Sequence, residues 1–381
     1  MSNNENSSNL YITDKDGNSL EHGCFGFVVM KFINEKEVFL DERTENINHY
    51  DTGHFGYKTN ENVFFVYERR KSLFQFIGLK IDIKKQIEIK KYLIHQFDCA
   101  QVYRHNQYIL VDDTVYGFKH TYPYPGKKYL KEYYRKFTSS PSGRNFNFDY
   151  HFSVLKRYTG YLDLDGLEVL DVAAGDGSFL RRIKNDCANV IGFEPSKTEC
   201  DEAKESHGIE LINCTFTPDM LEPGRKFDIV IAGDILEHVH EPYNFMDEIK
   251  SVMRPGAYMF FQVPNDFNTL QVKYLENTGS NPWFVCPPEH LNYWNVEEAR
   301  SFVKQCGFEV VHEEAQFPME MFLLFGMDYL KQPELGKKAH AMRCNFEDAF
   351  SNDMDMLSLV YKKFLEAGIG RDYVAILKFV S

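Results

Sequence analysis

One stretch of the chain, residues 167–184, constrains the fold more than any other: LEVLDVAAGDGSFLRRIK. Its first part, LEVLDVA, is apolar and β-branched enough to be a fully buried central strand, and SFLRRIK has the apolar spacing of a helix face. Between them the backbone must turn sharply, and Gly175 and Gly177 permit this because glycine adopts left-handed conformations at little steric cost. The stretch therefore predicts a strand, a tight turn and a helix in direct succession.

The residues after 166 alternate between predicted strands and predicted helices with short connections. Such alternation is typical of a parallel sheet with helices on both faces. We therefore expect an α/β fold with a seven-stranded, mostly parallel sheet, preceded by a smaller β-rich N-terminal domain. The predicted strands are 167–172, 189–194, 209–213, 227–232, 257–263, 308–312 and 373–380, and the predicted helices are 178–186, 197–206, 243–253 and 296–305.

The chain is long enough for two domains, since 381 residues exceed the size of one ordinary domain. Aromatic and β-branched residues between polar turns indicate short strands, so residues 1–118 are predicted to be the β-rich domain. Residues 119–165 are rich in Lys, Arg and Tyr and are predicted to be a basic, aromatic linker with a lead-in helix. Residues 166–381 form the second predicted domain, with a helical insertion around 315–370.

Composition and charge argue against several classes of function. A net charge of −13 opposes a general affinity for nucleic-acid backbones. No run approaches the ~18 to 20 apolar residues of a membrane helix, and the polar start lacks the layout of a signal peptide. The eight cysteines show no C-x-x-C pair and no Cys/His metal spacing, so reduced thiols are expected. We expect a cytoplasmic protein without metal, membrane or nucleic-acid partners. Whether the chain forms a homo-oligomer is left open by its sequence.

The glycine turn also restricts which nucleotide the sheet can hold. The dinucleotide fingerprint G-x-G-x-x-G would need a glycine at the position of Leu180, and the G-x-x-x-x-G-K-[ST] phosphate loop is absent. A pyrophosphate, and with it a nicotinamide oxidoreductase, is therefore disfavoured. Glu194 ends the second predicted strand, 23 residues beyond Asp171, where a carboxylate can accept hydrogen bonds from both hydroxyls of a ribose. Adenosine without a pyrophosphate is the cofactor implied.

Four segments then follow one another in a recognisable order: LEVLDVAAGDGSFL, VIGFEPS, FDIVIAGDILEHVHEP and MRPGAYMFFQVPN. This series resembles the ordered motifs of class I S-adenosylmethionine-dependent methyltransferases, over residues 166 to 312. Ala173 stands where the family has the first glycine of its turn, which makes the turn slightly stiffer. The segments DILEHVHEP and PPEHLNYW resemble the subgroup that acts on quinones, sugars and natural products. The resemblance implies S-adenosyl-L-methionine as cofactor and methyl transfer as the reaction.

The resemblance also implies which residues bind the cofactor. The turn after the first strand would meet its methionine end, Glu194 its ribose and Thr215 with Phe216 its adenine, while Gly233 and Asp234 would lie below the sulfonium. Two plainer interpretations stay open: Asp171 caps the following turn, and Glu194 is a carboxylate at a helix start. The implied cofactor residues are Asp171, Ala173, Ala174, Gly175, Gly177, Glu194, Pro195, Thr215, Phe216, Gly233 and Asp234.

The chemistry requires an acceptor aligned with the sulfonium and, for a hydroxyl acceptor, a general base. Histidine titrates near neutral pH and suits this role. The candidate catalytic residues are His290, His238, His240 and Asp234, and His290 is the favoured base because it lies in a loop rich in polar and aromatic residues. For His238, a structural role at a helix start is an equal alternative.

The acceptor is predicted from residues 281–295, NPWFVCPPEHLNYWN, where Trp283, Tyr293 and Trp294 stand beside hydrogen-bonding side chains. Flat aromatic faces with a polar rim suit a sugar ring, and the basic linker would meet a phosphate or another anionic group on the same small molecule. We therefore expect O-methylation of a sugar, a nucleotide-sugar or a polysaccharide precursor. The alternatives are an N- or C-methyltransferase of another metabolite and a non-catalytic adenosine-binding module.

Overall fold

The protein, described here by a computed structural model, divides into two compact units. The first unit comprises residues 1–103 and 111–117, and the second comprises residues 104–110 and 118–381. The residues whose structure is described are 9–13, 25–31, 49–58, 64–68, 101–105, 108–113, 116–122, 124–136, 145–161, 164–186 and 189–380.

The first unit contains a four-stranded antiparallel sheet in the order β1-β2-β3-β4. Each strand pairs with the one that precedes it among these four, so the sheet is a simple meander. The strands are β1 (Asn9–Thr13), β2 (Phe25–Lys31), β3 (His49–Lys58) and β4 (Phe64–Glu68).

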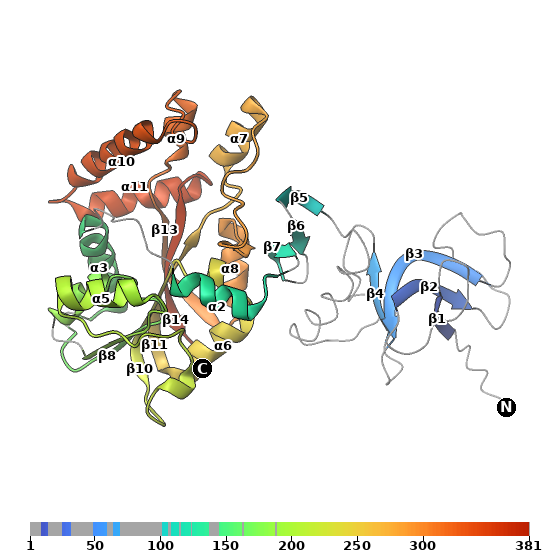
Figure 1. Cartoon of the computed structure of the whole chain (residues 1–381), viewed down its shortest axis with the longest axis horizontal. Helices are drawn as coiled ribbons and strands as arrows, with labels where there is room; N and C mark the ends of the chain where they lie inside the picture. The colour runs from blue at the N-terminus through green and yellow to red at the C-terminus, as the bar shows by residue number, and fades with distance from the viewer. Residues whose placement is uncertain are drawn as a thin grey trace. The chain divides into compact units, whose positions relative to one another are not determined.

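Six strands form the main sheet of the second unit, in the order β13-β14-β11-β10-β8-β9 (Figure 1). Neighbours from β9 to β11 pair in parallel, whereas β14 is antiparallel to both β11 and β13. The predicted α/β fold with a mostly parallel sheet is confirmed. The strands are β8 (Glu168–Asp171), β9 (Asn189–Gly192), β10 (Phe227–Gly233), β11 (Met253–Pro264), β13 (Phe308–Ala315) and β14 (Asp372–Phe379).

The seventh predicted strand, residues 209–213, does not form, and the expected strand count is wrong by one. This segment contributes one isolated parallel bridge, between Phe193 and Ile212. The chain turns away directly afterwards, because the Cys214 amide donates back to the Ile212 carbonyl at 2.8 Å and the Asn213 side chain donates to the Glu194 carbonyl at 3.0 Å. Pairing therefore stops after a single residue.

Both faces of the sheet are covered, as the continuous apolar run in β10 indicates. Ile229 and Ile231 face a core built with α3 (Asn145–Thr159), α4 (Ser178–Lys184) and residues of the C-terminal helices. Val230 and Ala232 are equally buried but point to the opposite face, because successive strand side chains alternate. Helices on both sides of the sheet account for the run of apolar side chains from Ile229 to Ala232.

The four predicted helices are confirmed, and local capping explains where two of them begin. The Ser196 side chain accepts a hydrogen bond from the Glu199 amide at the start of α5, and Asn295 with Glu298 forms a capping box at the start of α8. The helices are α4, α5 (Lys197–His207), α6 (Pro242–Val252) and α8 (Val296–Gln305).

Four short strands form a third sheet in the order β12-β7-β6-β5. β12 pairs antiparallel with β7 through Asn292 opposite His120 and Tyr293 opposite Lys119. This pairing fixes the segment that follows His290 against residues that precede the linker. The elements are β5 (Gln101–His105), β6 (Tyr108–Asp113), β7 (Phe118–Tyr122), β12 (Asn292–Tyr293) and, in the linker, α2 (Lys127–Arg135).

Three helices lie between β13 and β14, within the segment predicted to be a helical insertion: α9 (Glu320–Leu324), α10 (Pro333–Asp348) and α11 (Met354–Glu366) (Figure 1). α10 and α11 are joined by a buried hydrogen bond from the Tyr361 hydroxyl to Glu347 Oε1 at 2.7 Å. α7 (Thr269–Thr278) follows β11. No helix that the structure describes is both long enough and apolar enough to cross a membrane.

We expect residues 119–381 to fold without the rest of the chain and to bind S-adenosylmethionine, because the main sheet and the packing on both its faces lie within this range. Circular dichroism and calorimetry on the shortened protein check this, with the full-length chain as control. A shortened chain that unfolds cooperatively but binds no cofactor contradicts this division of the chain.

Candidate active site

The candidate site lies at the edge of the main sheet where the parallel strands end. Asp171 ends β8, Glu194 follows β9 and Asp234 follows β10. Because β14 runs antiparallel and pairs Asp372 with Pro264, the beginning of β14 lies at the same edge. Ligands of open α/β sheets bind in the crevice at this edge.

The glycine turn has the geometry predicted for it. Gly175 and Gly177 have φ values of 54° and 73°, in the left-handed region. A Cβ added to Gly175 would meet no atom within 4 Å, whereas one added to Gly177 would lie 3.0 Å from the Ala203 Cβ. Gly175 thus exposes its backbone to open space, and Gly177 allows close approach of α5. The Ala174 amide donates to the Phe193 carbonyl at 2.9 Å and holds the turn on β9.

Two buried carboxylates flank this turn. Asp171 Oδ1 accepts a hydrogen bond from the Ala173 amide at 3.1 Å, and Glu194 accepts from the amides of Gly175 at 3.0 Å and Ser196 at 2.7 Å. Burial raises the pKa of Asp171 to about 7 and also raises the pKa of Glu194. The two plainer roles, turn cap and helix-start carboxylate, are therefore both present. A carboxylate oxygen has two lone pairs, so each group retains acceptor capacity for a ligand.

The adenine-side residues divide between surface and core. Thr215 is exposed, whereas the Phe216 ring is buried and packs edge-on against Phe193 and Phe245, with centroids 5.3 and 6.1 Å apart. The Pro195 carbonyl accepts from the Asn213 side chain at 3.1 Å. The adenine contacts stay a prediction, and any contact from Phe216 would come from its backbone rather than its ring face.

Asp234 follows Gly233 in an unusual conformation. Its φ of 51° is left-handed, which costs energy for a residue with a Cβ and is common at functional sites. The Gln262 amide group donates to both Asp234 carboxylate oxygens, at 2.9 and 3.1 Å, and Gln316 donates to Gln262 Oε1 at 3.3 Å. The sequence analysis missed these two glutamines, which hold Asp234 in place from β11 and from the end of β13.

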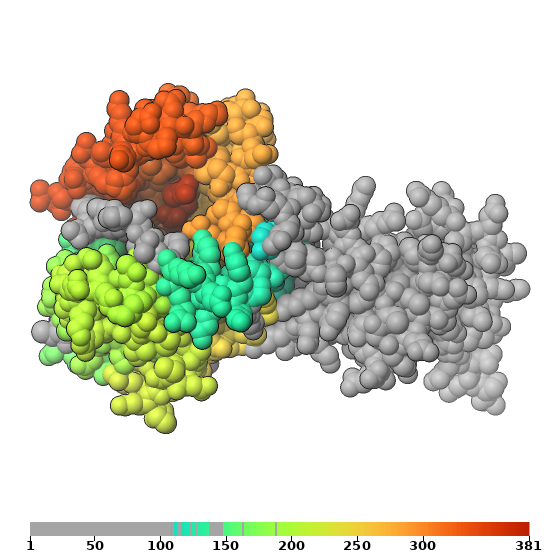
Figure 2. Space-filling view, in the orientation of Figure 1, coloured from blue at the N-terminus to red at the C-terminus, as the bar shows by residue number. Residues whose placement is uncertain are grey.

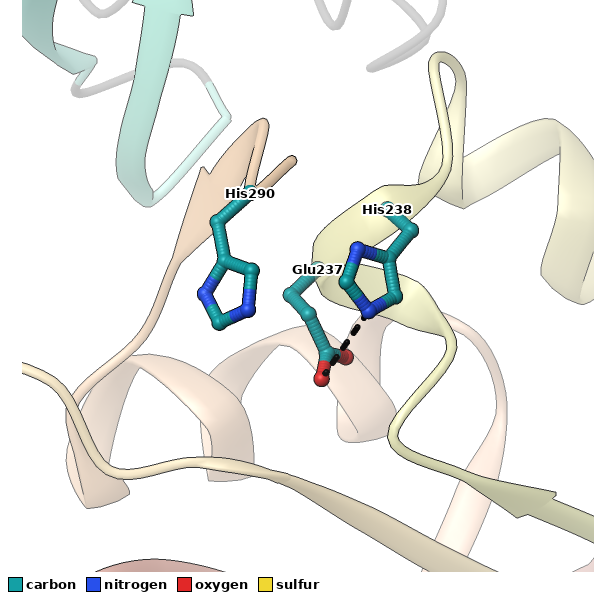
Figure 3. Close-up of side chains that lie close together, drawn as sticks. All are labelled: Glu237, His238 and His290. Atoms are coloured by element: carbon teal, nitrogen blue, oxygen red, sulfur yellow. Dashed lines mark ion pairs between the residues drawn. The ribbon is translucent and has the colours of Figure 1, made fainter. Parts of the chain in front are cut away.

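Three side chains converge beside this position: Glu237, His238 and His290 (Figure 3). One donor atom from each lies within 4.8 Å of the other two. His238 and His290 were predicted from separate segments, and the fold brings their rings to a centroid distance of 5.0 Å. His240 lies outside this group, with its Nδ1 3.3 Å from Glu241 Oε1. Glu237 was missed, although it stands in the same DILEHV segment as His238.

The orientation of the His238 ring is fixed by the linker and by the loop before β12. Its Nδ1 lies 2.7 Å from the Glu289 carbonyl, which can only accept, so Nδ1 carries the proton in the neutral ring. The Tyr134 hydroxyl, on α2, donates to the same carbonyl at 2.7 Å and lies 3.0 Å from His238 Nδ1. The lone pair of His238 Nε2 is therefore directed to the side of Glu237, whose Oε1 is 3.8 Å away.

Burial controls the charge of this cluster. It lowers the pKa of His238 to about 4 and that of His290 to about 3, and it raises the pKa of Glu237 well above its ordinary value, with the charge of Asp234 raising it further. Both imidazoles are neutral at pH 7 and can accept a proton. Two imidazoles and a carboxylate at this spacing could also hold a divalent cation, and the expectation of no metal stays a prediction.

Two of the aromatic residues predicted to face a sugar belong to the core instead, so this prediction is wrong for them. Trp294 is buried, with its ring 4.6 Å from Phe118 and 5.5 Å from Phe302. Tyr293 is fully buried as part of β12, and its hydroxyl donates to the His290 carbonyl at 2.8 Å. Both faces of a tryptophan in such a packed cluster are occupied. Trp283 is half-buried, and its contact with a sugar stays a prediction.

Comparison with known proteins agrees with this geometry. Residues 144–313 match a family model described as a methyltransferase domain. The ubiquinone biosynthesis O-methyltransferase of Rhodopseudomonas palustris strain BisB5 is 33% identical over 106 residues, which cover 27% of this chain and 42% of that protein. The enzyme of the same name from Brucella anthropi is 31% identical over 105 residues, which cover 26% of this chain and 42% of that protein. The chain thus spans less than half the length of these curated relatives.

Solved structures of methyltransferases are also similar in fold. Magnesium protoporphyrin IX methyltransferase from Synechocystis is 14% identical with a TM-score of 0.41, covering 67% of this chain and 100% of that chain. A SAM-dependent methyltransferase from Archaeoglobus fulgidus is 17% identical with a TM-score of 0.38, covering 62% and 96%.

The matched domain contains the glycine turn, the Glu194 strand end and the histidine cluster, which are the features that define the site. Residues 144–313 are a methyltransferase domain, for which S-adenosyl-L-methionine is the methyl donor.

Replacing Glu194 with alanine should weaken the binding of S-adenosylmethionine by roughly tenfold or more, because charge-assisted hydrogen bonds contribute about 1.5–3 kcal/mol. Calorimetry measures the affinity, and the exposed Glu205→Ala on α5 is the matched control. Unchanged affinity in a folded Glu194→Ala protein would rule out a ribose contact.

Stability should fall as the pH is lowered from about 6.5 towards 4. The pKa of His238 is about 4 in the folded protein and near 6.5 in the unfolded chain, so the unfolded state binds more protons in this window. At pH 5 this residue lowers the free energy of unfolding by on the order of 2 kcal/mol. Urea unfolding at pH 7 and pH 5 measures it, and His238→Gln should flatten the dependence. If the free energy of unfolding changes equally with pH in the unchanged protein and in His238→Gln, the pKa of His238 is not lowered.

Proposed function

We propose that the protein transfers the methyl group of S-adenosyl-L-methionine to a hydroxyl group of a small-molecule acceptor. The observation that carries this proposal is the cluster of Glu237, His238 and His290 at the same sheet edge as the cofactor residues. The name of the curated relatives, O-methyltransferase, supports an oxygen acceptor.

The residues at the edge fit this cofactor. The open backbone at Gly175 leaves room for a ligand beside the turn, and the Glu194 carboxylate next to it can accept hydrogen bonds from ribose hydroxyls. Asp171 and Gly233 with Asp234 would hold the methionine end. When bound, the cofactor supplies an electrophilic methyl group on a sulfonium, so the protein needs to supply alignment and a proton acceptor.

His238 is the proposed base. Its Nδ1 is held by the Glu289 carbonyl and the Tyr134 hydroxyl, which leaves Nε2 to accept the acceptor's proton. A hydroxyl that takes up the methyl group becomes strongly acidic, and its proton would pass to His238 Nε2. Glu237 lies beside the imidazolium that would form, with its Oε1 3.8 Å from Nε2. His290, the base favoured from the sequence, lies beside His238 and Glu237. Variants at both histidines are therefore needed to assign the base.

A sugar, a nucleotide-sugar or a polysaccharide precursor is the acceptor class that we propose, and carbohydrate biosynthesis in the cytoplasm is the proposed setting. The support is the polar character of the loop around His290 and the basic linker helix α2, whose Tyr134 reaches the histidine cluster. A neutral amine acceptor would not require the base, because its nitrogen already carries the attacking lone pair.

His238→Ala should lower kcat by ~10²- to 10⁴-fold and leave cofactor affinity unchanged, because a base acts on the acceptor's proton and not on the cofactor. His290→Ala tests the neighbouring ring, and His240→Ala, outside the cluster, is the matched control. Methyl transfer from radiolabelled cofactor and calorimetry are measured separately. Full turnover in all three variants would point to an amine or carbon acceptor, and a loss confined to His240→Ala would overturn the assignment.

A further inference from the structure

One exposed side of α2 carries a run of positive charges. Lys128, Lys131 and Arg135 stand at positions i, i+3 and i+7, so they form a stripe along the helix, which we call the basic stripe. All three side chains are exposed, and none has a hydrogen-bond or ion-pair partner within the part of the chain that the structure describes. This stripe contrasts with the net charge of −13 of the whole chain.

Contacts on another side of α2 fix the basic stripe beside the candidate site. The Tyr134 hydroxyl donates to the Glu289 carbonyl at 2.7 Å and lies 3.0 Å from His238 Nδ1. Because a helix rises about 1.5 Å per residue, Lys131 and Arg135 lie within one turn of these contacts. A helix with its side chains is about 10 Å across, so the stripe lies roughly that far from the histidine cluster.

The basic stripe lies near the segment that follows β9. Burial raises the pKa of the Cys214 thiol, and the charge of Lys131 opposes this rise. Thr215, the next residue, is exposed. In Figure 2 the outer surface of α2, in blue-green, is open to the viewer and borders the yellow-green part of the chain around residue 200. The stripe is therefore an accessible surface at the rim of the candidate site, unlike the buried acidic groups of the sheet edge.

We propose that Lys128, Lys131 and Arg135 bind a phosphate or diphosphate group of the acceptor while the acceptor's hydroxyl lies at the histidine cluster. This inference rests on the proposed function and narrows the acceptor to a phosphorylated sugar. Lysine and arginine are the side chains that recognise phosphate, and three cations match the negative charges of a phosphate ester. A sugar with an attached diphosphate is long enough to reach from the histidine cluster to the basic stripe.

The groups of the sheet edge support the same choice. Glu237 is buried beside His238, and a phosphate placed there would lose its hydration without gaining a cation. Arg371, at the start of β14, already donates to Glu320 at 2.9 Å. The basic stripe instead offers unpaired cations at the surface, where a phosphate keeps part of its hydration.

The test uses the full chain and measures binding by calorimetry in the presence of saturating S-adenosylhomocysteine. Inorganic pyrophosphate probes the basic stripe without any sugar, and glucose 1-phosphate is compared with methyl glucopyranoside, which lacks the charge. We expect pyrophosphate to bind, and its affinity to fall as the salt concentration is raised. We expect glucose 1-phosphate to bind about tenfold or more tightly than the uncharged glycoside.

Two variants locate the effect. Lys131→Gln and Arg135→Gln should each weaken pyrophosphate binding by about three- to fivefold, because an exposed ion pair contributes modestly, and together by about tenfold or more. The double variant should also lose the salt dependence, which a merely structural change would not remove. Lys338→Gln takes one charge from an exposed position on α10 and is the matched control. Circular dichroism checks that each variant is folded.

The outcomes separate this inference from the proposed function. If the stripe variants weaken pyrophosphate binding while His238→Ala leaves methyl transfer unchanged, the stripe is supported and the proposed chemistry is contradicted. If pyrophosphate does not bind, or if Lys338→Gln weakens it as much as the stripe variants do, the inference is overturned and the proposed chemistry is untouched. Binding to phosphatidylglycerol vesicles that pyrophosphate does not displace also overturns it, because the stripe then contacts a lipid surface.

Discussion

The hydrogen bond from the Gly175 amide to the Glu194 carboxylate joins the two parts of the predicted cofactor site. It requires β8 and β9 to be neighbours in register, which Asp171 opposite Gly192 ensures, and it requires the left-handed backbone of Gly175. With this contact in place, the glycine turn and the Glu194 carboxyl group lie next to each other at the edge of the sheet. The other functional groups reach it because the carboxyl ends of β10 and β11 and the beginning of β14 lie at the same edge.

Buried carboxylates dominate this edge, and that constrains what it can bind. Asp171, Glu194, Glu237 and Asp266 all have raised pKa values because burial disfavours their charged forms. Each is costly in the free protein unless it is protonated or hydrogen-bonded. A ligand that brings positive charge and hydrogen-bond donors relieves this cost, and S-adenosylmethionine with a hydroxylated acceptor does both. The acidic edge is thus suited to a cationic cofactor and unsuited to an anionic group.

Local pattern predicted the sheet and the glycine turn, because strand and helix periodicity and the left-handed glycines are properties of neighbouring residues. It failed at residues 209–213, where side-chain hydrogen bonds end the pairing after one residue. It also failed for Tyr293, an aromatic residue that looked accessible and is part of the core. Glu237 and Tyr134 join the site through contacts with segments far away in sequence, and no periodic pattern records such contacts.

The most direct measurement of the central claim is calorimetric titration of the full chain with S-adenosylmethionine and, separately, with NAD. The account predicts saturable binding of S-adenosylmethionine and none of NAD, because Leu180 stands where the dinucleotide fingerprint needs a glycine and the Gly175 turn abuts the Glu194 carboxylate. Binding of NAD without binding of S-adenosylmethionine would contradict the account, since the edge would then hold a pyrophosphate.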